Sequence, residues 1–232
     1  MATRPLTVPR RTLLVGAGFG AAHIELCRSV FCVRTTATTL SLSGAYGVVD
    51  ALEVGATVLP LQLTDTVRLL NPSIYGRYRL VRSDSVQVGA ELFVLIPAME
   101  GSSASLQLSV PVWLHASEVL RVQTGLSYAV IFDRREALHS FIIPANFVLN
   151  ATDALHFGVN TGLTIAAQDA QLLLVAPLGF EAGVAVAGTG DRPLVDIVGA
   201  FLWPAFIASG GRTTINSGIW TASLSARFFF FL

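Results

Sequence analysis

Lysine is absent from this 232-residue chain, and charged residues of both signs are scarce. Fifteen basic and fifteen acidic side chains balance each other, and charged residues make up only 13% of the chain, whereas soluble domains carry about 25%. This balance gives no electrostatic basis for binding nucleic acid. Because 53% of the residues are hydrophobic, we expect much of the surface to face lipid instead of water.

Long apolar runs are also missing. No stretch of about 18 uninterrupted apolar residues occurs, so the sequence does not predict a transmembrane helix. A closed β-barrel is the other structure that spans a bilayer, because it leaves no backbone group unpaired in hydrocarbon.

Four short acidic turns recur along the chain, at Asp50, Asp84, Glu118 and Asp153, and a looser fifth follows at Asp191. The first four are 34, 34 and 35 residues apart. A period of about 34 could indicate a helical solenoid. Each interval, however, contains two runs in which large apolar residues alternate with polar or small ones, and a period of two is typical of β-strands.

We therefore predict an all-β fold, an antiparallel up-and-down barrel of twelve strands forming one domain over residues 1–232. The runs are about as long as the 9 to 11 residues that a tilted membrane-spanning strand needs. Five turns on one side join six hairpins, so both termini should lie on the turn side. The predicted strands are 12–24, 38–48, 52–63, 73–82, 86–97, 105–116, 120–132, 139–150, 155–166, 171–186, 194–207 and 219–232.

The last strand alternates hydrophobic residues from Trp220 to Leu232 and contains Phe228 and Phe230. In this it resembles the bacterial outer-membrane β-barrel proteins, whose final strand closes with an aromatic residue that the barrel-assembly machinery recognises. The resemblance implies an outer-membrane location, membrane lipid and the assembly machinery as partners, and an assembly signal at Phe228, Phe230 and Leu232. The chain departs from the family in ending on leucine. The rival fold is a soluble β-sandwich whose hydrophobic surfaces are covered by partners.

Residues 10–21 allow three interpretations. Gly16, Gly18 and Ala21 fit a dinucleotide-binding fingerprint, but no alternation of strands and helices follows. The pair Arg10 and Arg11 before a short apolar segment is similar to a twin-arginine export signal. The third interpretation is a first barrel strand with its glycines turned inward, in a chain without its secretory leader.

Cys27 and Cys32 fall in a predicted first long loop, residues 25–37, which we expect to face the outside, with the short turns facing the periplasm. An oxidising location would permit a disulfide between them, although two unpaired thiols are the alternative. Two thiols without a nearby histidine give too few ligands for a metal site, and we expect no cofactor.

Polar side chains on the predicted inward face suggest the function. In a barrel of this size they would line a narrow interior and either pair with one another or select ions and small solutes. We therefore predict a small passive channel, and a structural barrel with a packed lumen is the alternative. The candidate lumen residues are Glu53, Arg77, Arg79, Glu91, His115, Arg121, His156, Glu181, Asp196 and Arg227.

An outer-membrane hydrolase is a further alternative. The four histidines, at positions 23, 115, 139 and 156, lie in unrelated segments. None accompanies a nucleophile motif such as G-x-S-x-G. We therefore do not expect an enzyme.

Overall fold

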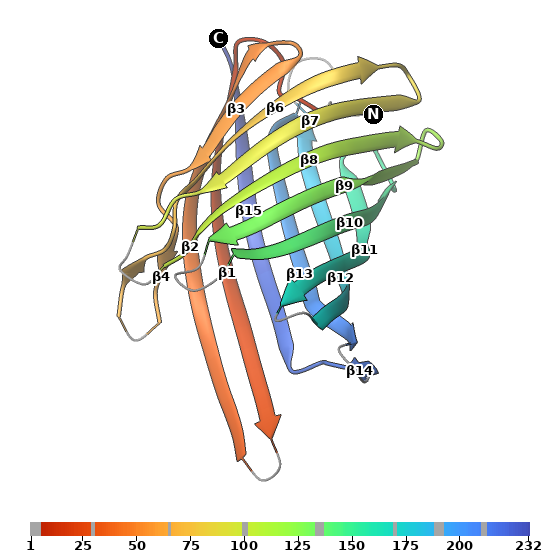
Figure 1. The fold of residues 1–232 in the computed structure, drawn as a ribbon. Helices are drawn as coiled ribbons and strands as arrows, with labels where there is room; N and C mark the ends of the chain where they lie inside the picture. Colours follow the sequence, from red (N-terminus) through yellow and green to blue (C-terminus); the bar gives the residue numbers. More distant parts are fainter. Residues whose placement is uncertain are drawn as a thin grey trace.

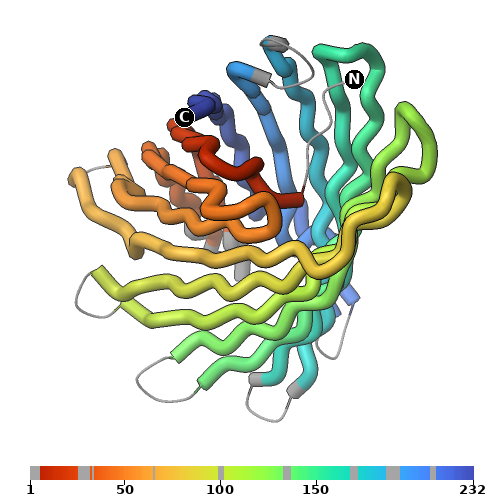
Figure 2. The backbone as a smooth tube through the Cα atoms, turned by 90° about the horizontal axis from the view of Figure 1, so that it is seen from above, coloured from red at the N-terminus to blue at the C-terminus, as the bar shows by residue number. Residues whose placement is uncertain are grey.

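The structure is a computed structural model, and it describes residues 6–28, 31–64, 66–98, 102–132, 137–168, 171–187, 193–209 and 213–232. Twelve antiparallel strands form a closed ring in these parts of the chain (Figures 1 and 2). They are β1 (Thr12–Arg28), β2 (Phe31–Val49), β3 (Leu52–Thr57), β6 (Ser73–Arg82), β7 (Val86–Leu95), β8 (Ala104–His115), β9 (Leu120–Phe132), β10 (Ala137–Asn150), β11 (Leu155–Gln168), β12 (Gln171–Ala187), β13 (Pro193–Ser209) and β15 (Ile219–Phe231).

The ring closes because β1 pairs with both β2 and β15. Thr12 is the register partner of Phe231, and the backbone N–H of Leu232 donates to the carbonyl of Arg11 at 2.8 Å. The described ends of the chain therefore lie together on the turn side, as the sequence predicted. Closure leaves no free sheet edge in the ring, which is the condition for a sheet to cross hydrocarbon.

Alternation along each strand sorts the side chains into two classes. Large apolar residues point outward and remain exposed, such as Leu92 (44%), Leu108 (53%) and Phe141 (49%). Their strand neighbours point into the ring. An apolar outer wall around a more polar interior is the arrangement of membrane-spanning barrels. No helix in the described residues is long and apolar enough to cross a membrane.

The structure corrects the predicted loop at residues 25–37. β1 runs on to Arg28 and β2 begins at Phe31, so these residues form the end of a long hairpin that projects beyond the ring (Figure 1). Cross-strand pairing between β1 and β2 continues through these residues, from Ile24 with Thr35 to Arg28 with Phe31, and holds the backbone extended over this length.

Three short strands modify the predicted set: β4 is a separate piece of the predicted strand 52–63, and β5 and β14 lie in predicted loops. β3 ends at Thr57, and the chain then forms β4 (Leu61–Gln62), which pairs with β2, and β5 (Arg68–Leu69), which pairs with β4. Pro60 interrupts the predicted strand 52–63 because proline cannot donate a ladder hydrogen bond. Within the predicted loop 209–218, β14 (Thr213–Ile215) pairs with β13. The fifth turn, at Asp191, lies outside the described residues.

Two prolines in the barrel wall are paired with glycines on the neighbouring strand. Pro111 on β8 is the register partner of Gly125 on β9, and Pro144 on β10 is the partner of Gly162 on β11. Both glycines have positive φ, +153° and +147°. On the other side of Pro144 the ladder is interrupted, and the hydroxyl of Thr124 donates to the carbonyl of Pro144 at 2.8 Å instead. Prolines are thus tolerated within membrane-length strands because small neighbours and a side-chain donor replace the lost pairing.

Candidate functional site in the barrel lumen

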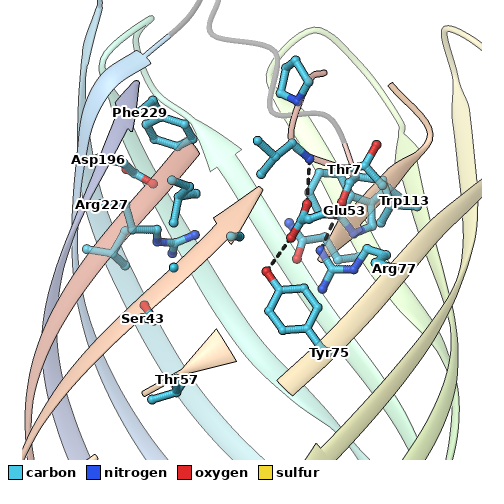
Figure 3. Close-up of a pocket in the computed structure, with 18 of the residues that line it drawn as sticks. Thr7, Ser43, Glu53, Thr57, Tyr75, Arg77, Trp113, Asp196, Arg227 and Phe229 are labelled. Carbon is cyan, nitrogen blue, oxygen red and sulfur yellow. Dashed lines mark hydrogen bonds between the residues drawn. The ribbon is translucent and has the colours of Figure 1, made fainter. Parts of the chain in front are cut away.

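A cavity of about 550 Å³ occupies the turn-side half of the lumen (Figure 3). Residues of the strands line it together with Leu6, Thr7, Val8 and Pro9. We call the segment Leu6–Pro9 the N-terminal strap. Figure 2 shows the first described residues, in red, lying inside the ring. Seven of the ten predicted lumen residues line this cavity, namely Glu53, Arg77, Arg121, His156, Glu181, Asp196 and Arg227.

Four buried polar residues occupy equivalent places in successive hairpins, each three residues after an acidic turn. They are Glu53, Gln87, Arg121 and His156, with exposed fractions of 4%, 8%, 6% and 3%. The repeat that divides the sequence into hairpins therefore also sets a ring of polar side chains at one depth in the lumen. Asp196, with 1% exposure, follows the looser fifth turn.

One wall of the lumen carries a connected polar cluster. The hydroxyl of Tyr75 donates to Oε1 of Glu53. Arg77, which is the register partner of both Glu53 and Glu91, donates through Nε to Oε2 of Glu91 at 2.6 Å. Because each charged group has a partner of opposite charge or a hydrogen bond, the cluster can remain ionised inside the barrel.

The N-terminal strap is tied to this wall. The backbone N–H of Val8 donates to Oε2 of Glu53 at 2.6 Å, and the N–H of Leu6 donates to Oε1 of Gln87 at 3.0 Å. Arg77 donates through Nη1 to the carbonyl of Leu6 at 3.1 Å. The strap thus fills part of the turn-side mouth and narrows the path through it.

Across the cavity from this cluster lie Asp196, Arg227 and Phe229 (Figure 3). Asp196 and Arg227 are register partners on β13 and β15. Opposite charges at directly paired positions stabilise a sheet face, and they also leave both signs of charge on this side of the lumen.

Aromatic and amide groups complete the lining. The guanidinium carbon of Arg121 lies 4.8 Å from the ring centroid of Trp113, a cation–π contact. Asn160 donates to Glu181 at 3.4 Å. The cavity therefore offers paired charges and aromatic faces, and we find no single dominant charge among the described residues.

Three predicted lumen residues are not part of this lining. Glu91 is the ion-pair partner of Arg77 on the neighbouring strand β7. Arg79 shares the face of Arg77 on β6 but lies closer to the turn, and His115 is the register partner of Arg121. The predicted polar lining omitted the N-terminal strap, Gln87 and Tyr75. Gln87 could have been found, because it holds the same place after its turn as the other three members of the ring.

Two of the remaining histidines lie on the outer side of the wall. His23 stacks on Trp220 at a centroid distance of 5.3 Å, and the hydroxyl of Tyr128 shares a hydrogen bond of 2.7 Å with Nδ1 of His139. The described residues contain no group of three or more His, Cys, Asp or Glu side chains that could hold a metal ion.

The two cysteines face each other across the tip of the long hairpin. Cys27 is the register partner of Cys32, and Cys32 is disulfide-bonded. The side chain of Cys27 itself lies outside those that the structure describes, so the Cys27–Cys32 pairing stays a prediction.

The final strand presents the predicted assembly signal on its outer face. Phe228, Phe230 and Leu232 are exposed. Phe229 and Phe231 line the cavity, and Phe231 is also exposed. Recognition of these residues by an assembly machinery remains a prediction.

No protein-family model matches the chain, and no curated protein sequence matches it. Solved structures do. An outer membrane channel from Pseudomonas putida F1 has a TM-score of 0.68 at 10% identity, with 98% of this chain and 100% of that chain covered. The NanC porin has a TM-score of 0.60 at 11% identity, with 93% and 98% covered. The translocator domain of the autotransporter NalP from Neisseria meningitidis has a TM-score of 0.54 at 12% identity, with 93% and 88% covered.

These likenesses concern the fold. Together with the closed ring and the apolar outer wall, they make the chain a transmembrane β-barrel of the bacterial outer-membrane type. The sandwich is wrong because the strands form one closed sheet instead of two packed ones. The dinucleotide-binding interpretation of residues 16–21 is wrong because Gly16 and Gly18 lie within strand β1 of the ring.

Proposed function

We propose that this barrel is a passive pore for ions or small polar solutes in the bacterial outer membrane. The observation that carries the proposal is the cavity of about 550 Å³, lined by both signs of charge, at the turn-side mouth of a closed barrel. Polar groups at that position would replace part of the hydration of a passing solute. Two of the similar folds belong to proteins described as a channel and a porin, and this likeness supports the same class.

The orientation forms part of the proposal. Short turns and both described chain ends would face the periplasm, and the long β1–β2 hairpin would face outside, as is general for bacterial barrels. Membrane lipid would contact the apolar outer wall.

The second candidate function is a structural barrel whose lumen is filled by protein and does not conduct. The packing of the N-terminal strap favours it. Leu6 and Thr7 are each only 1% exposed, so the strap is packed as tightly as a protein core. If the barrel is a pore, ions must pass beside the strap, or the strap must leave the mouth before they pass.

A substitution on the barrel wall separates the two candidates. A Cβ atom at Gly47 would lie 1.9 Å from the carbonyl oxygen of Pro9, so Gly47→Val forces the strap away from the mouth. Gly76→Val is the matched control, because a Cβ at Gly76 meets nothing within 4 Å.

The experiment measures single-channel conductance of the three proteins in planar bilayers. We expect small conductance steps from the unmodified protein and from Gly76→Val, and larger steps from Gly47→Val. If neither the unmodified protein nor correctly folded Gly47→Val passes current, the pore proposal is wrong and the packed structural barrel takes its place.

A further inference from the structure

We propose that the lumen wall at Glu53, Arg77 and Gln87 is a binding site for the main chain of short extended peptides, which the N-terminal strap occupies in this structure. The inference rests on the proposed function in one respect, since a peptide reaches the site in a cell only through an open mouth. It adds a class of ligand to a pore that otherwise distinguishes solutes by size and charge.

The contacts that define the site are made to backbone atoms. Gln87 accepts the N–H of Leu6 at 3.0 Å, and Arg77 donates to the carbonyl of the same residue at 3.1 Å. Glu53 accepts the N–H of Val8 at 2.6 Å. A donor, an acceptor and a second donor at this spacing occur in every extended peptide, so these three hydrogen bonds do not depend on the side chains of the strap.

Two of the three wall residues, Arg77 and Glu53, are held in position by contacts outside the strap. Glu91 fixes Arg77 through Nε at 2.6 Å, and Tyr75 hydrogen-bonds the other carboxylate oxygen of Glu53. The wall would therefore keep its arrangement after the strap has left, and a preorganised site loses less entropy when it binds a ligand.

An apolar pocket beside these groups sets a preference for an aliphatic residue. The side chain of Leu6 is buried to 1% exposure, and a Cβ on Gly89 would lie 2.8 Å from its Cδ2 atom. Gly89 thus makes the space that Leu6 fills. Main-chain hydrogen bonds that give affinity and pockets that give specificity are the features of extended-peptide recognition. The expected ligand is a peptide with an aliphatic residue two positions before a second aliphatic residue.

The test uses the full chain in detergent micelles and a dye-labelled peptide, acetyl-Leu-Thr-Val-Pro-amide, followed by fluorescence anisotropy. Leu6→Asp vacates the site without altering the wall, because a carboxylate is costly to bury in an apolar pocket. We expect Leu6→Asp to bind the peptide about tenfold more tightly than the unmodified protein does, since the strap competes only in the latter. Gly47→Val, which displaces the strap by steric contact, is the second variant and should behave in the same way.

Two changes then test main-chain recognition. In the Leu6→Asp background, Gln87→Leu removes the acceptor for the peptide N–H, and a peptide with N-methyl-leucine removes the donor. Each should weaken binding by about three- to tenfold, the usual effect of one lost hydrogen bond.

Equal binding to the unmodified and the vacated protein, or no loss with the N-methyl peptide, would overturn the inference. The micelle measurement needs no conductance. Absence of current with retained peptide binding would therefore contradict the proposed pore alone, and current without peptide binding would contradict only the peptide site.

Discussion

The backbone N–H of Val8 donates to the carboxylate of Glu53 at 2.6 Å, inside the turn-side mouth of the barrel. This contact links a segment before the first strand to the polar ring of the lumen. Since Glu53 is 4% exposed, its carboxylate depends on protein partners instead of water. The stability of the barrel and the position of the N-terminal strap are therefore coupled through one side chain.

Replacing Glu53 with leucine should destabilise the barrel and release the strap. The change leaves the Val8 N–H and the Tyr75 hydroxyl without their acceptor, and each buried unsatisfied group costs about 1–3 kcal/mol. We expect a loss of about 2–5 kcal/mol in the free energy of unfolding, measured by urea titration of the protein in micelles. Water that enters the lumen can hydrogen-bond the exposed groups and lowers this loss. Glu118→Leu in an exposed turn is the control and should change the midpoint little. An unchanged midpoint for Glu53→Leu would show that the contact contributes nothing to folding.

The glycines opposite the prolines should be intolerant of a side chain. Gly125 and Gly162 have φ values of +153° and +147°, and a Cβ atom on either would lie 2.4 Å from a carbonyl oxygen of the preceding proline-bearing strand. We expect Gly125→Ala and Gly162→Ala each to lower the free energy of unfolding by more than about 1 kcal/mol. Gly76→Ala, with open space and ordinary φ, serves for comparison. Equal midpoints for all three variants would contradict this account of the proline positions.

Most of the ring could be predicted from the sequence because lipid imposes a strict period of two. Strands 73–82 and 120–132 were predicted with the bounds that the structure shows. The signal fails where alternation is not required by hydrocarbon, as in the hairpin end at residues 25–37, which the cross-strand pairing extends beyond the ring. The period-two pattern also fails at Pro60, because this proline interrupts the strand although the residues around it are apolar.

The lumen was predictable in part for the same reason. Inward positions follow from alternation, and the place of Glu53 after its turn recurs at Gln87 and Arg121. The N-terminal strap could not be found in this way. Residues 6–8 form no ladder with a neighbouring strand, so the alternation that places side chains in the lumen does not extend to them. Which side chains meet across the lumen depends on the closure of the ring, and strand patterns alone do not determine it.

The cysteine pair should be oxidised in protein purified without reductant. Cross-strand partners have Cα atoms about 4.5–5.5 Å apart, within the range of about 4.4–6.8 Å that disulfides require, and Cys27 is paired with Cys32 in the register. We expect no alkylation of the unfolded protein by iodoacetamide before reduction and two alkylated sites afterwards, measured by intact mass. Cys27→Ser should expose one reactive thiol without reduction. Because the closed loop is short, the same variant should lower the free energy of unfolding by about 2 kcal/mol, less than the loss of a bridge that closes a long loop. Alkylation of the unreduced parent protein would disprove the bridge.

The charge of Arg227 should influence which ions pass. This residue lies in the cavity opposite the cluster of Glu53 and is the register partner of Asp196, so Arg227→Gln leaves Asp196 with less compensation. A unit charge about 4 Å from a passing ion changes its energy by about 1 kcal/mol even at the dielectric constant of water, which corresponds to about a fivefold change in relative occupancy. We expect the reversal potential in a salt gradient to move toward cation selectivity.

Arg68→Gln, on the short strand β5 outside the ring, removes the same charge away from the lumen and should leave the reversal potential unchanged. Raising the salt concentration should reduce the difference between the two variants, since mobile ions screen exposed charges over about 10 Å at 0.1 M. A shift of equal size in both variants would assign the effect to the net charge of the protein. A shift in neither would mean that Arg227 does not lie on the path of the conducted ions.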